Sequence, residues 1–169
     1  AVGVDGLRLD AAKHFDPFVL NYLDRAVYRE SVRPYLNGAQ RNVFSFSEAF
    51  DGNSDYLQTL VRKDIDPSNP GVIGGNRDAL DFPLFFALHD NLTNNGFNNS
   101  LFNVHNASLD LHDDGLNNGS QGVMFVQSHD SAGPDLSNVA YAYTLMHPGN
   151  AIVYFNAKEF GDNRDFPKD

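Results

Sequence analysis

Short apolar runs alternate with segments of helical periodicity along most of this chain of 169 residues. The apolar runs have the length of strands, and the segments between them space their hydrophobic residues as an amphipathic helix does. Because such alternation is typical of parallel strands covered by helices, the sequence predicts one α/β domain or a piece of one. The expected elements are strands at residues 2–9, 41–50, 122–130 and 150–155, helices at residues 16–36, 55–63 and 135–147, and a short strand running into a helix at residues 79–92.

Two stretches interrupt the alternation. Residues 66–76 contain proline and glycine, and the asparagine-rich residues 94–121 show little periodicity. Both are therefore predicted to be loops, the second with room for a short helix. A group of residues that resembles metal ligands lies in the second stretch: Asp110, His112, Asp113 and Asp114. Their spacing matches no established ligand pattern, and we expect a solvated loop.

The balance of charges limits the partners of this chain. Its formal net charge of −10 argues against a protein that neutralises rows of phosphates, so we expect no nucleic-acid partner. The apolar runs are too short to span a bilayer, which argues against a membrane partner. The chain has no cysteine, so disulfides and thiolate metal sites are excluded. Cysteine usage leaves the compartment open, and we favour an extracellular or periplasmic location in a bacterium over a cytoplasmic one.

Three carboxylate residues stand where apolar strands give way to the following turn or helix, namely Asp10, Glu48 and Asp130. Asp10 also fits a helix N-cap, Glu48 a solvated loop residue and Asp130 a turn cap. The carboxyl ends of parallel strands point to one face, where ligands bind in β/α architectures. Two of the carboxylates have a cationic or titratable neighbour, Arg8 and His129, although a lone histidine is more often a satisfied core residue. We expect the three carboxylates to converge on a functional site.

Three short segments resemble a known family of enzymes. The segments GLRLDAAKH (residues 6–14), FSFSEAF (44–50) and FVQSHD (125–130) resemble, in order and separation, the second, third and fourth conserved segments of the α-amylase family of glycoside hydrolases, family 13. The stretches ALDFPLFFAL and MHPGNAIVYFNAKEFG extend the resemblance over nearly the whole chain. The resemblance implies that residues 1–169 are the C-terminal part of a catalytic (β/α)8 TIM barrel, about strands four to eight with their helices.

The resemblance also implies that the chain is a piece of a longer enzyme. The remaining barrel strands and the accessory domains would lie outside these residues. Because a barrel that is cut open exposes a sheet edge, we expect these 169 residues by themselves to have low stability and no activity.

The implied activity is that of a retaining glycoside hydrolase acting on α-1,4-glucosidic bonds of starch-like glucans or maltooligosaccharides. Such hydrolysis needs one ionised and one protonated carboxyl group about 5 to 5.5 Å apart. The resemblance makes Asp10 the nucleophile, Glu48 the general acid/base and Asp130 the carboxylate that binds sugar hydroxyls. We expect Arg8 to keep Asp10 ionised and oriented, and the Phe-rich strand before Glu48 to disfavour its charged form.

Further residues of the same segments are implied in substrate binding. Lys13 and His14 match family positions on the leaving-group side of the cleft, and His129 would donate a hydrogen bond to sugar hydroxyls. The resemblance also implies Ca²⁺ in the longer enzyme, with the backbone carbonyl of His14 as a ligand and the remaining ligands outside this chain. An α-glucan or a maltooligosaccharide is the expected partner.

Departures from the family pattern leave alternatives open. Ser47, Ser128 and Ala151 stand where the family commonly has glycine, asparagine and proline, and none of them removes a catalytic group. An α-glucan transglycosylase would share all three carboxylates and would differ only in whether water or a sugar hydroxyl resolves the glycosyl-enzyme. A non-catalytic relative that uses the barrel as a binding scaffold is the third alternative, although such relatives typically lose carboxylates.

Overall fold

The computed structural model of the chain describes residues 6–16, 18–20, 22–23, 26, 33–34, 40–41, 44–65, 73–93, 96–97 and 101–154. The chain forms two compact units, Ala1–Leu80 and Asp81–Asp169. Each unit has its own parallel strands and its own helices. The described part of the chain is therefore mixed α/β, with short strands in small sheets.

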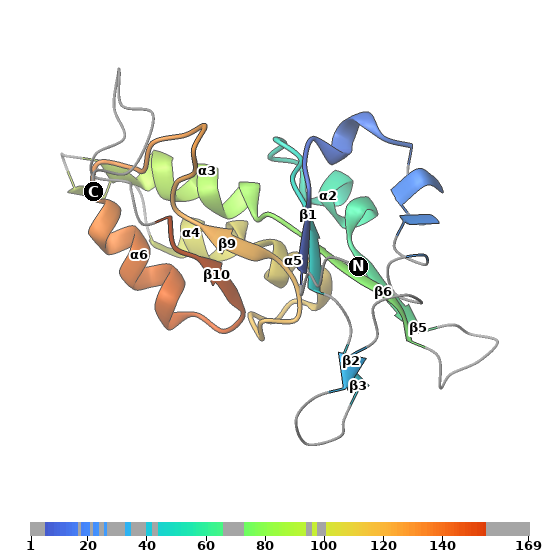
Figure 1. Cartoon of the computed structure of the whole chain (residues 1–169). Coiled ribbons are helices and arrows are strands. Elements are labelled where there is room, and N and C mark those ends of the chain that lie inside the picture. Colours follow the sequence, from blue (N-terminus) through green and yellow to red (C-terminus); the bar gives the residue numbers. More distant parts are fainter. Residues whose placement is uncertain are drawn as a thin grey trace. The chain divides into compact units, whose positions relative to one another are not determined.

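The first unit is built on a four-stranded sheet, whose strands lie side by side in Figure 1. Its order is β1 (Gly6–Leu9), β4 (Phe44–Ser47), β6 (Ile73–Ala79) and β5 (Arg62–Ile65). β1, β4 and β6 are parallel, whereas β5 runs antiparallel to β6. The strands predicted before Asp10 and Glu48 are thus confirmed, and they are neighbours in the sheet.

A single turn of 3-10 helix, η1 (Ala12–His14), follows β1. Residues 18–20, 22–23 and 26 are helical, as predicted for residues 16–36, and the side chain of Asp16 accepts the backbone N–H of Phe18 at 2.9 Å. The end of that prediction is wrong, because Arg33–Pro34 form strand β2, which pairs with β3 (Gln40–Arg41) in an antiparallel ladder. Proline has no N–H to donate, which removes the hydrogen bond that would continue a helix there.

The helix predicted at residues 55–63 is α2 (Ser54–Leu60), which ends three residues earlier than expected. Its N-cap is Asn53, whose side chain accepts the backbone N–H of Tyr56 at 3.2 Å. At the other end, the guanidinium of the buried Arg77 donates to the carbonyl of Leu60 at 2.7 Å. The chain then turns into β5 and returns as β6, so the prediction of a loop was wrong for residues 73–76.

The second unit holds a parallel pair of strands, β9 (Val123–Phe125) and β10 (Asn150–Ile152), joined through helix α6 (Ser137–Met146). This is a β-α-β connection, and it confirms a strand, a helix and a strand within the expected residues 122–130, 135–147 and 150–155. Both strands are shorter than predicted, since they end at Phe125 and Ile152, and residue 155 lies outside the described part. A short antiparallel hairpin, β7 (Leu92–Thr93) with β8 (Gly96–Phe97), completes the strands.

Helix α3 (Phe82–Asn91) begins where β6 ends, as predicted for residues 79–92. Asp81 is its N-cap and accepts the backbone N–H of Leu84 at 2.9 Å, and Pro83 occupies the first turn, where a missing N–H costs little. The core of the second unit forms between α3, α4, β9 and α6, and its buried members are Leu84, Leu88, Leu92, Val104, Met124, Val126 and Ala140.

Two helices occupy part of the stretch that was predicted as a loop at residues 94–121. They are α4 (Leu101–Ala107) and α5 (Leu109–Asp114), and both pack against α3. Ser108 caps α5 by accepting the backbone N–H of Asp110 at 3.2 Å, and Gly115 ends it in the left-handed conformation. The sequence left room for one short helix in this stretch, and the described residues form two. Their positions were not predicted, because such short helices are held by caps and tertiary contacts rather than by a long apolar stripe.

The predicted barrel fragment stays a prediction, since each unit holds only a part of the parallel strands that a barrel would need. Among the described residues, no helix combines the length and the apolar character that crossing a membrane would require.

Candidate active site

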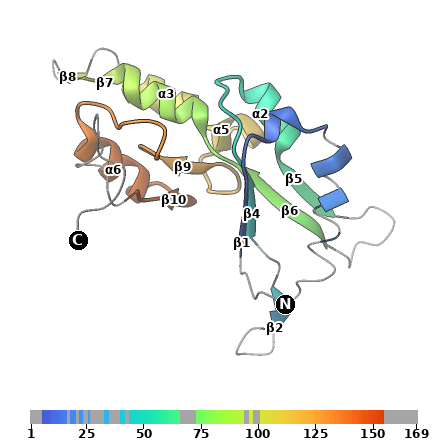
Figure 2. The ribbon, with the colours of Figure 1, turned by 45° about the horizontal axis from the view of Figure 1, so that its top comes forward.

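The register between β1 and β4 places the first two predicted carboxylates at one edge of the sheet. Leu9 is the partner of Ser47 in the parallel ladder, and Asp10 and Glu48 are the next residues of the two strands. Figure 2 shows the two strands side by side. Because the carboxyl ends of parallel strands share an edge, Asp10 and Glu48 emerge next to each other, as the sequence predicts.

Asp10 is paired with Arg8 at this edge. Nη2 of Arg8 lies 2.7 Å from Oδ1 of Asp10, in a charge-assisted hydrogen bond between residues of the same strand face. The side chain of Asp10 is 76% exposed and that of Arg8 is 33% exposed. The following 3-10 turn is capped by Ala11 without a side-chain bond, so Asp10 does not serve as the cap that the sequence also allowed.

Glu48 is bound to the chain segment that follows β1. Its backbone N–H donates to the carbonyl of Leu9 at 2.8 Å, and its carbonyl accepts the N–H of Ala12 at 2.7 Å. Its carboxyl oxygen Oε2 accepts the N–H of Ala11 at 2.8 Å. The half-buried Glu48 is therefore not a solvated loop residue, and its side chain has a backbone donor that the expected apolar surroundings did not include.

Lys13 and His14 are exposed in η1, the turn directly after Asp10. They lie close in sequence to the candidate nucleophile, and their contact with a substrate stays a prediction. The described residues contain no group of three or more histidine or carboxylate side chains arranged to hold a metal ion. The carbonyl of His14 would supply a single oxygen, whereas Ca²⁺ takes about six to eight, so calcium binding with further ligands from outside this chain stays a prediction and no step below uses the ion.

His129 and Asp130 lie in a tight turn after β9, in the second unit. Nε2 of His129 is 3.0 Å from Oδ2 of Asp130, and both side chains are exposed, so His129 is not a core histidine. Ser128 holds the turn, since its Oγ accepts the N–H of Asp130 at 3.1 Å and its own N–H donates to the carbonyl of Ser131 at 2.9 Å. The bond that caps the turn is thus made by Ser128 rather than by the carboxyl group of Asp130, which is paired with His129.

The structure brings the predicted residues together in two groups. Arg8, Asp10 and Glu48 lie at one sheet edge in the first unit. His129 and Asp130 lie in one turn of the second unit. The convergence of all three carboxylates stays a prediction.

Asp81 is a carboxylate that sequence reasoning did not single out, although it follows β6 as Asp10 follows β1. It is only 1% exposed. Besides capping α3, it accepts the backbone N–H of Leu109 at 2.9 Å and the hydroxyl of Ser108 at 3.5 Å. These bonds hold the starts of α3 and α5, so we assign Asp81 a structural role. Its place directly before Phe82-Pro83 is typical of a helix N-cap and could have been recognised in the sequence.

Asp110 likewise differs from its prediction as a residue of a solvated loop. It is buried, and its carboxyl oxygens accept the N–H groups of Gly119 at 2.8 Å and Gln121 at 2.9 Å and the hydroxyl of Ser120 at 3.1 Å. The carboxylate therefore fixes the turn at residues 119–121. His112, Asp113 and Asp114 are exposed, as expected.

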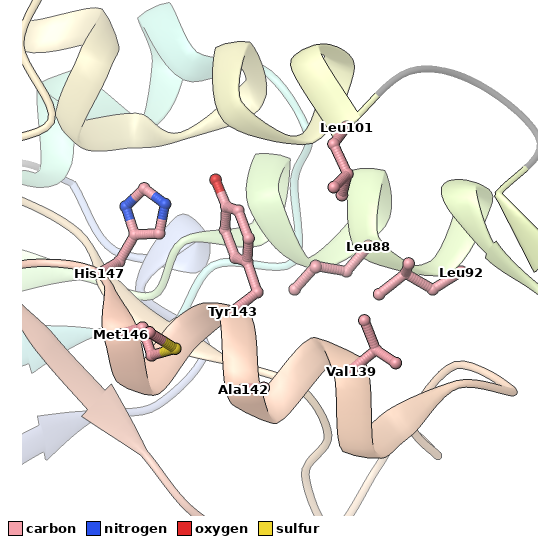
Figure 3. A pocket seen from close by; sticks show the side chains of 8 residues that line it. All are labelled: Leu88, Leu92, Leu101, Val139, Ala142, Tyr143, Met146 and His147. Atoms are coloured by element: carbon pink, nitrogen blue, oxygen red, sulfur yellow. The ribbon is translucent and has the colours of Figure 1, made fainter.

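A pocket of about 390 Å³ lies among helices α3, α4 and α6, as Figure 3 shows. In that view Leu88 of α3 and Leu92, the first residue of β7, face Val139 of α6. Burial raises the pKa of Tyr143 to about 12, with the charge of Asp81 acting in the same direction. The pocket contains none of the predicted site residues and no carboxylate; its lining is Leu88, Leu92, Leu101, Val139, Ala142, Tyr143, Met146 and His147.

A scan against models of known protein families gives no match, and a search of curated proteins gives none either.

Proposed function

We propose that this chain carries part of the active site of a retaining glycoside hydrolase that cleaves α-1,4-glucosidic bonds in starch-like glucans or maltooligosaccharides. The observation that supports it most is the placement of Asp10 and Glu48 at adjacent carboxyl ends of parallel strands, with Arg8 bonded to Asp10. A pair of carboxylates with separate environments is what retaining hydrolysis requires. The resemblance of three sequence segments to the α-amylase family supplies the substrate class.

In the proposed first step, the ionised carboxylate of Asp10 attacks the anomeric carbon. A bond from Asp10 to that carbon forms while the bond to the glycosidic oxygen breaks, and Glu48 gives its proton to the departing oxygen. Arg8 orients the nucleophile by its hydrogen bond. Asp130 and His129 would bind hydroxyl groups of the sugar.

In the second step, water attacks the same carbon and releases Asp10. Glu48, now ionised, takes the proton from the water, which restores both carboxyl groups to their starting states. Two displacements at one carbon retain the α configuration. In a transglycosylase, a sugar hydroxyl would replace the water without any change in the residues.

The test is to supply soluble starch to the full-length protein and to resolve the products by size and anomeric form over time. Short α-configured maltooligosaccharides are expected. Glu48→Gln should nearly abolish the reaction, whereas Asp55→Asn, an acid-to-amide change on the exposed face of α2, should leave it intact. Cyclic or elongated glucans would identify a transglycosylase, and no turnover by a well-folded protein would contradict the proposal.

A second measurement identifies the nucleophile. An activated fluoro-sugar that forms a slow covalent intermediate should label Asp10, because a carboxylate that attacks the anomeric carbon remains attached to it. Asp10→Asn should prevent the labelling. A label found on another carboxylate would show that the nucleophile is misassigned.

A further inference from the structure

We propose that the backbone N–H of Ala11 positions the general acid Glu48, by occupying Oε2 and thereby leaving Oε1 as the oxygen that carries the catalytic proton. This inference rests on the proposed function, because it assigns a task to the acid of that reaction. It makes Ala11 a positioning residue, since the alanine acts through Glu48 and need not touch the substrate.

The geometry around Glu48 supports this assignment. The N–H groups of two successive residues, Ala11 and Ala12, both point at Glu48. The first meets the side-chain oxygen Oε2 at 2.8 Å, and the second meets the main-chain oxygen at 2.7 Å. The two bonds hold the backbone and the carboxyl group of Glu48 to the same turn.

The two bonds have different consequences. The bond from Ala12 and the bond from the Glu48 N–H to Leu9 already join the turn to strand β4 through the main chain. The bond from Ala11 adds a fixed orientation of the carboxyl group. The sheet does not need the bond from Ala11 to the side chain of Glu48. That bond serves to orient the carboxyl group.

Ala11 donates to Glu48 from a backbone conformation that is unfavourable for alanine. Its φ of 49° and ψ of 39° lie in the left-handed region, and it is the non-glycine residue with positive φ among those that the structure describes. Alanine is disfavoured in that region, because its Cβ approaches the backbone. Strained residues of this kind concentrate at functional sites, where the surroundings hold them in place.

The bond from Ala11 determines which oxygen of Glu48 carries the proton. A carboxylic acid carries its proton on one oxygen and accepts hydrogen bonds best through the other. Because Oε2 accepts the N–H of Ala11, protonated Glu48 carries its proton on Oε1. This is the proton that Glu48 gives to the departing glycosidic oxygen in the proposed reaction. After the leaving group has departed, Oε1 is again the free oxygen that receives the proton from water.

The experiment replaces the backbone amide of Ala11 by an ester in the full-length protein, which removes the N–H and keeps the methyl side chain. The matched control is the same replacement at Ala12, which removes a bond of similar length from the same turn but leaves the carboxyl group of Glu48 untouched. Two substrates are compared, a maltooligosaccharide and α-glucosyl fluoride. The fluoride needs little help from an acid, because its leaving group is already stable.

The ester at residue 11 should lower kcat on the maltooligosaccharide about tenfold or more, with little change in KM or in the rate on the fluoride. The alkaline limb of its pH profile for kcat/KM should also move. The ester at residue 12 should leave the ratio of the two rates as it is in the unmodified protein. An unchanged ratio with the ester at residue 11 would overturn the proposal.

A measurement without turnover separates this inference from the proposed function. In protein labelled with ¹⁵N-alanine, the amide signal of Ala11 should shift with pH as Glu48 titrates, and Glu48→Gln should remove that shift. If the Ala11 signal shifts with the titration of Glu48 but no glucan is cleaved, the assignment of Ala11 as the donor is correct and the proposed activity is wrong. If the Ala11 signal does not depend on the titration of Glu48 while starch is hydrolysed, the assignment of Ala11 as the donor is wrong and the proposed activity is correct.

Discussion

The exposed carboxyl group of Asp10 is oriented by a residue only two positions away. Arg8 and Asp10 point to the same face of the strand, so their pairing at 2.7 Å is a local property of the sequence. An ion pair this exposed contributes little to stability. Its effect is expected in the orientation of the carboxylate, for which the rigid guanidinium suits better than the ammonium of lysine.

Arg8→Ala should therefore damage activity far more than stability. We expect kcat/KM on a maltooligosaccharide to fall by about a hundredfold or more, because Asp10, the proposed nucleophile, loses its orientation. The free energy of unfolding should change by less than about 1 kcal/mol. The kcat/KM of Arg8→Lys should lie between those of the unmodified protein and of Arg8→Ala. Full activity in the alanine variant would refute the role given to Arg8.

At the scale of secondary-structure elements, the buried carboxyl group of Asp81 ties two helices together. It accepts backbone N–H groups at the start of α3 and at the start of α5. Asp81→Ala should lower the free energy of unfolding by about 2 to 4 kcal/mol, since it leaves buried donors without their acceptor.

Asn53→Ala is the matched comparison, because it removes the N-cap of α2, which is exposed and serves one helix. Its expected loss is about 1 kcal/mol. Urea unfolding followed by circular dichroism measures both variants. Equal losses would mean that the second bond of Asp81 contributes nothing.

Two glycines with nearly the same φ angle allow the cost of a positive φ to be measured separately from the cost of a close contact. Gly115, the C-cap of α5, has φ 81° and open space around the position of a Cβ atom. Gly119 has φ 80°, but a Cβ atom there would lie 2.5 Å from the backbone nitrogen of Gly149. The close approach joins the turn after α5 to the turn before β10.

Gly115→Ala should cost about 1 to 2 kcal/mol of stability, the penalty of the left-handed conformation alone. Gly119→Ala should cost about 1 to 3 kcal/mol more, because the backbone of Gly149 must also move. Urea unfolding of both variants gives the comparison. A Gly119 variant no less stable than the Gly115 variant would show that the two turns do not need their close contact.

For the molecule as a whole, two half-buried histidines make stability depend on pH. Burial lowers the pKa of His89, against the opposing effects of a hydrogen bond with the backbone of Val126 and the charges of Asp90 and Asp135. Burial also lowers the pKa of His147, together with the charge of His105. Because the unfolded chain then binds protons more readily than the folded one, stability is present above a pH of about 6.5 and is lost as pH falls below it.

We expect the free energy of unfolding to decrease between about pH 7.5 and pH 5.5, and His89→Gln to make that decrease smaller. Tyr143→Phe is the control, because a pKa of about 12 keeps this residue neutral throughout the range. Urea unfolding at several pH values measures the slope. A slope that is the same with and without His89 would rule out this contribution.

The order of elements was predictable wherever apolar residues keep a regular spacing over several turns or along a strand. The strands ending before Asp10 and Glu48, the helix after Asp81 and the β-α-β connection of the second unit are examples. For helices α4 and α5 the sequence left room for only one short helix without placing it, since each has fewer than three turns and is held by Ser108, Gly115 and contacts with α3. Such contacts come from residues that no short window of sequence contains.

The pairing of Arg8 with Asp10 and the placement of Asp10 and Glu48 after apolar strands could be read from the amino-acid order, because both follow from side-chain alternation and local composition. The antiparallel pairing of β5 with β6 could not, and neither could the donor to Glu48, which is the N–H of Ala11, 37 residues earlier in the chain. Periodicity reports which face of an element is buried. The partner of a given hydrogen-bonding group depends on strand register and turn conformation, which are set when distant segments pack together.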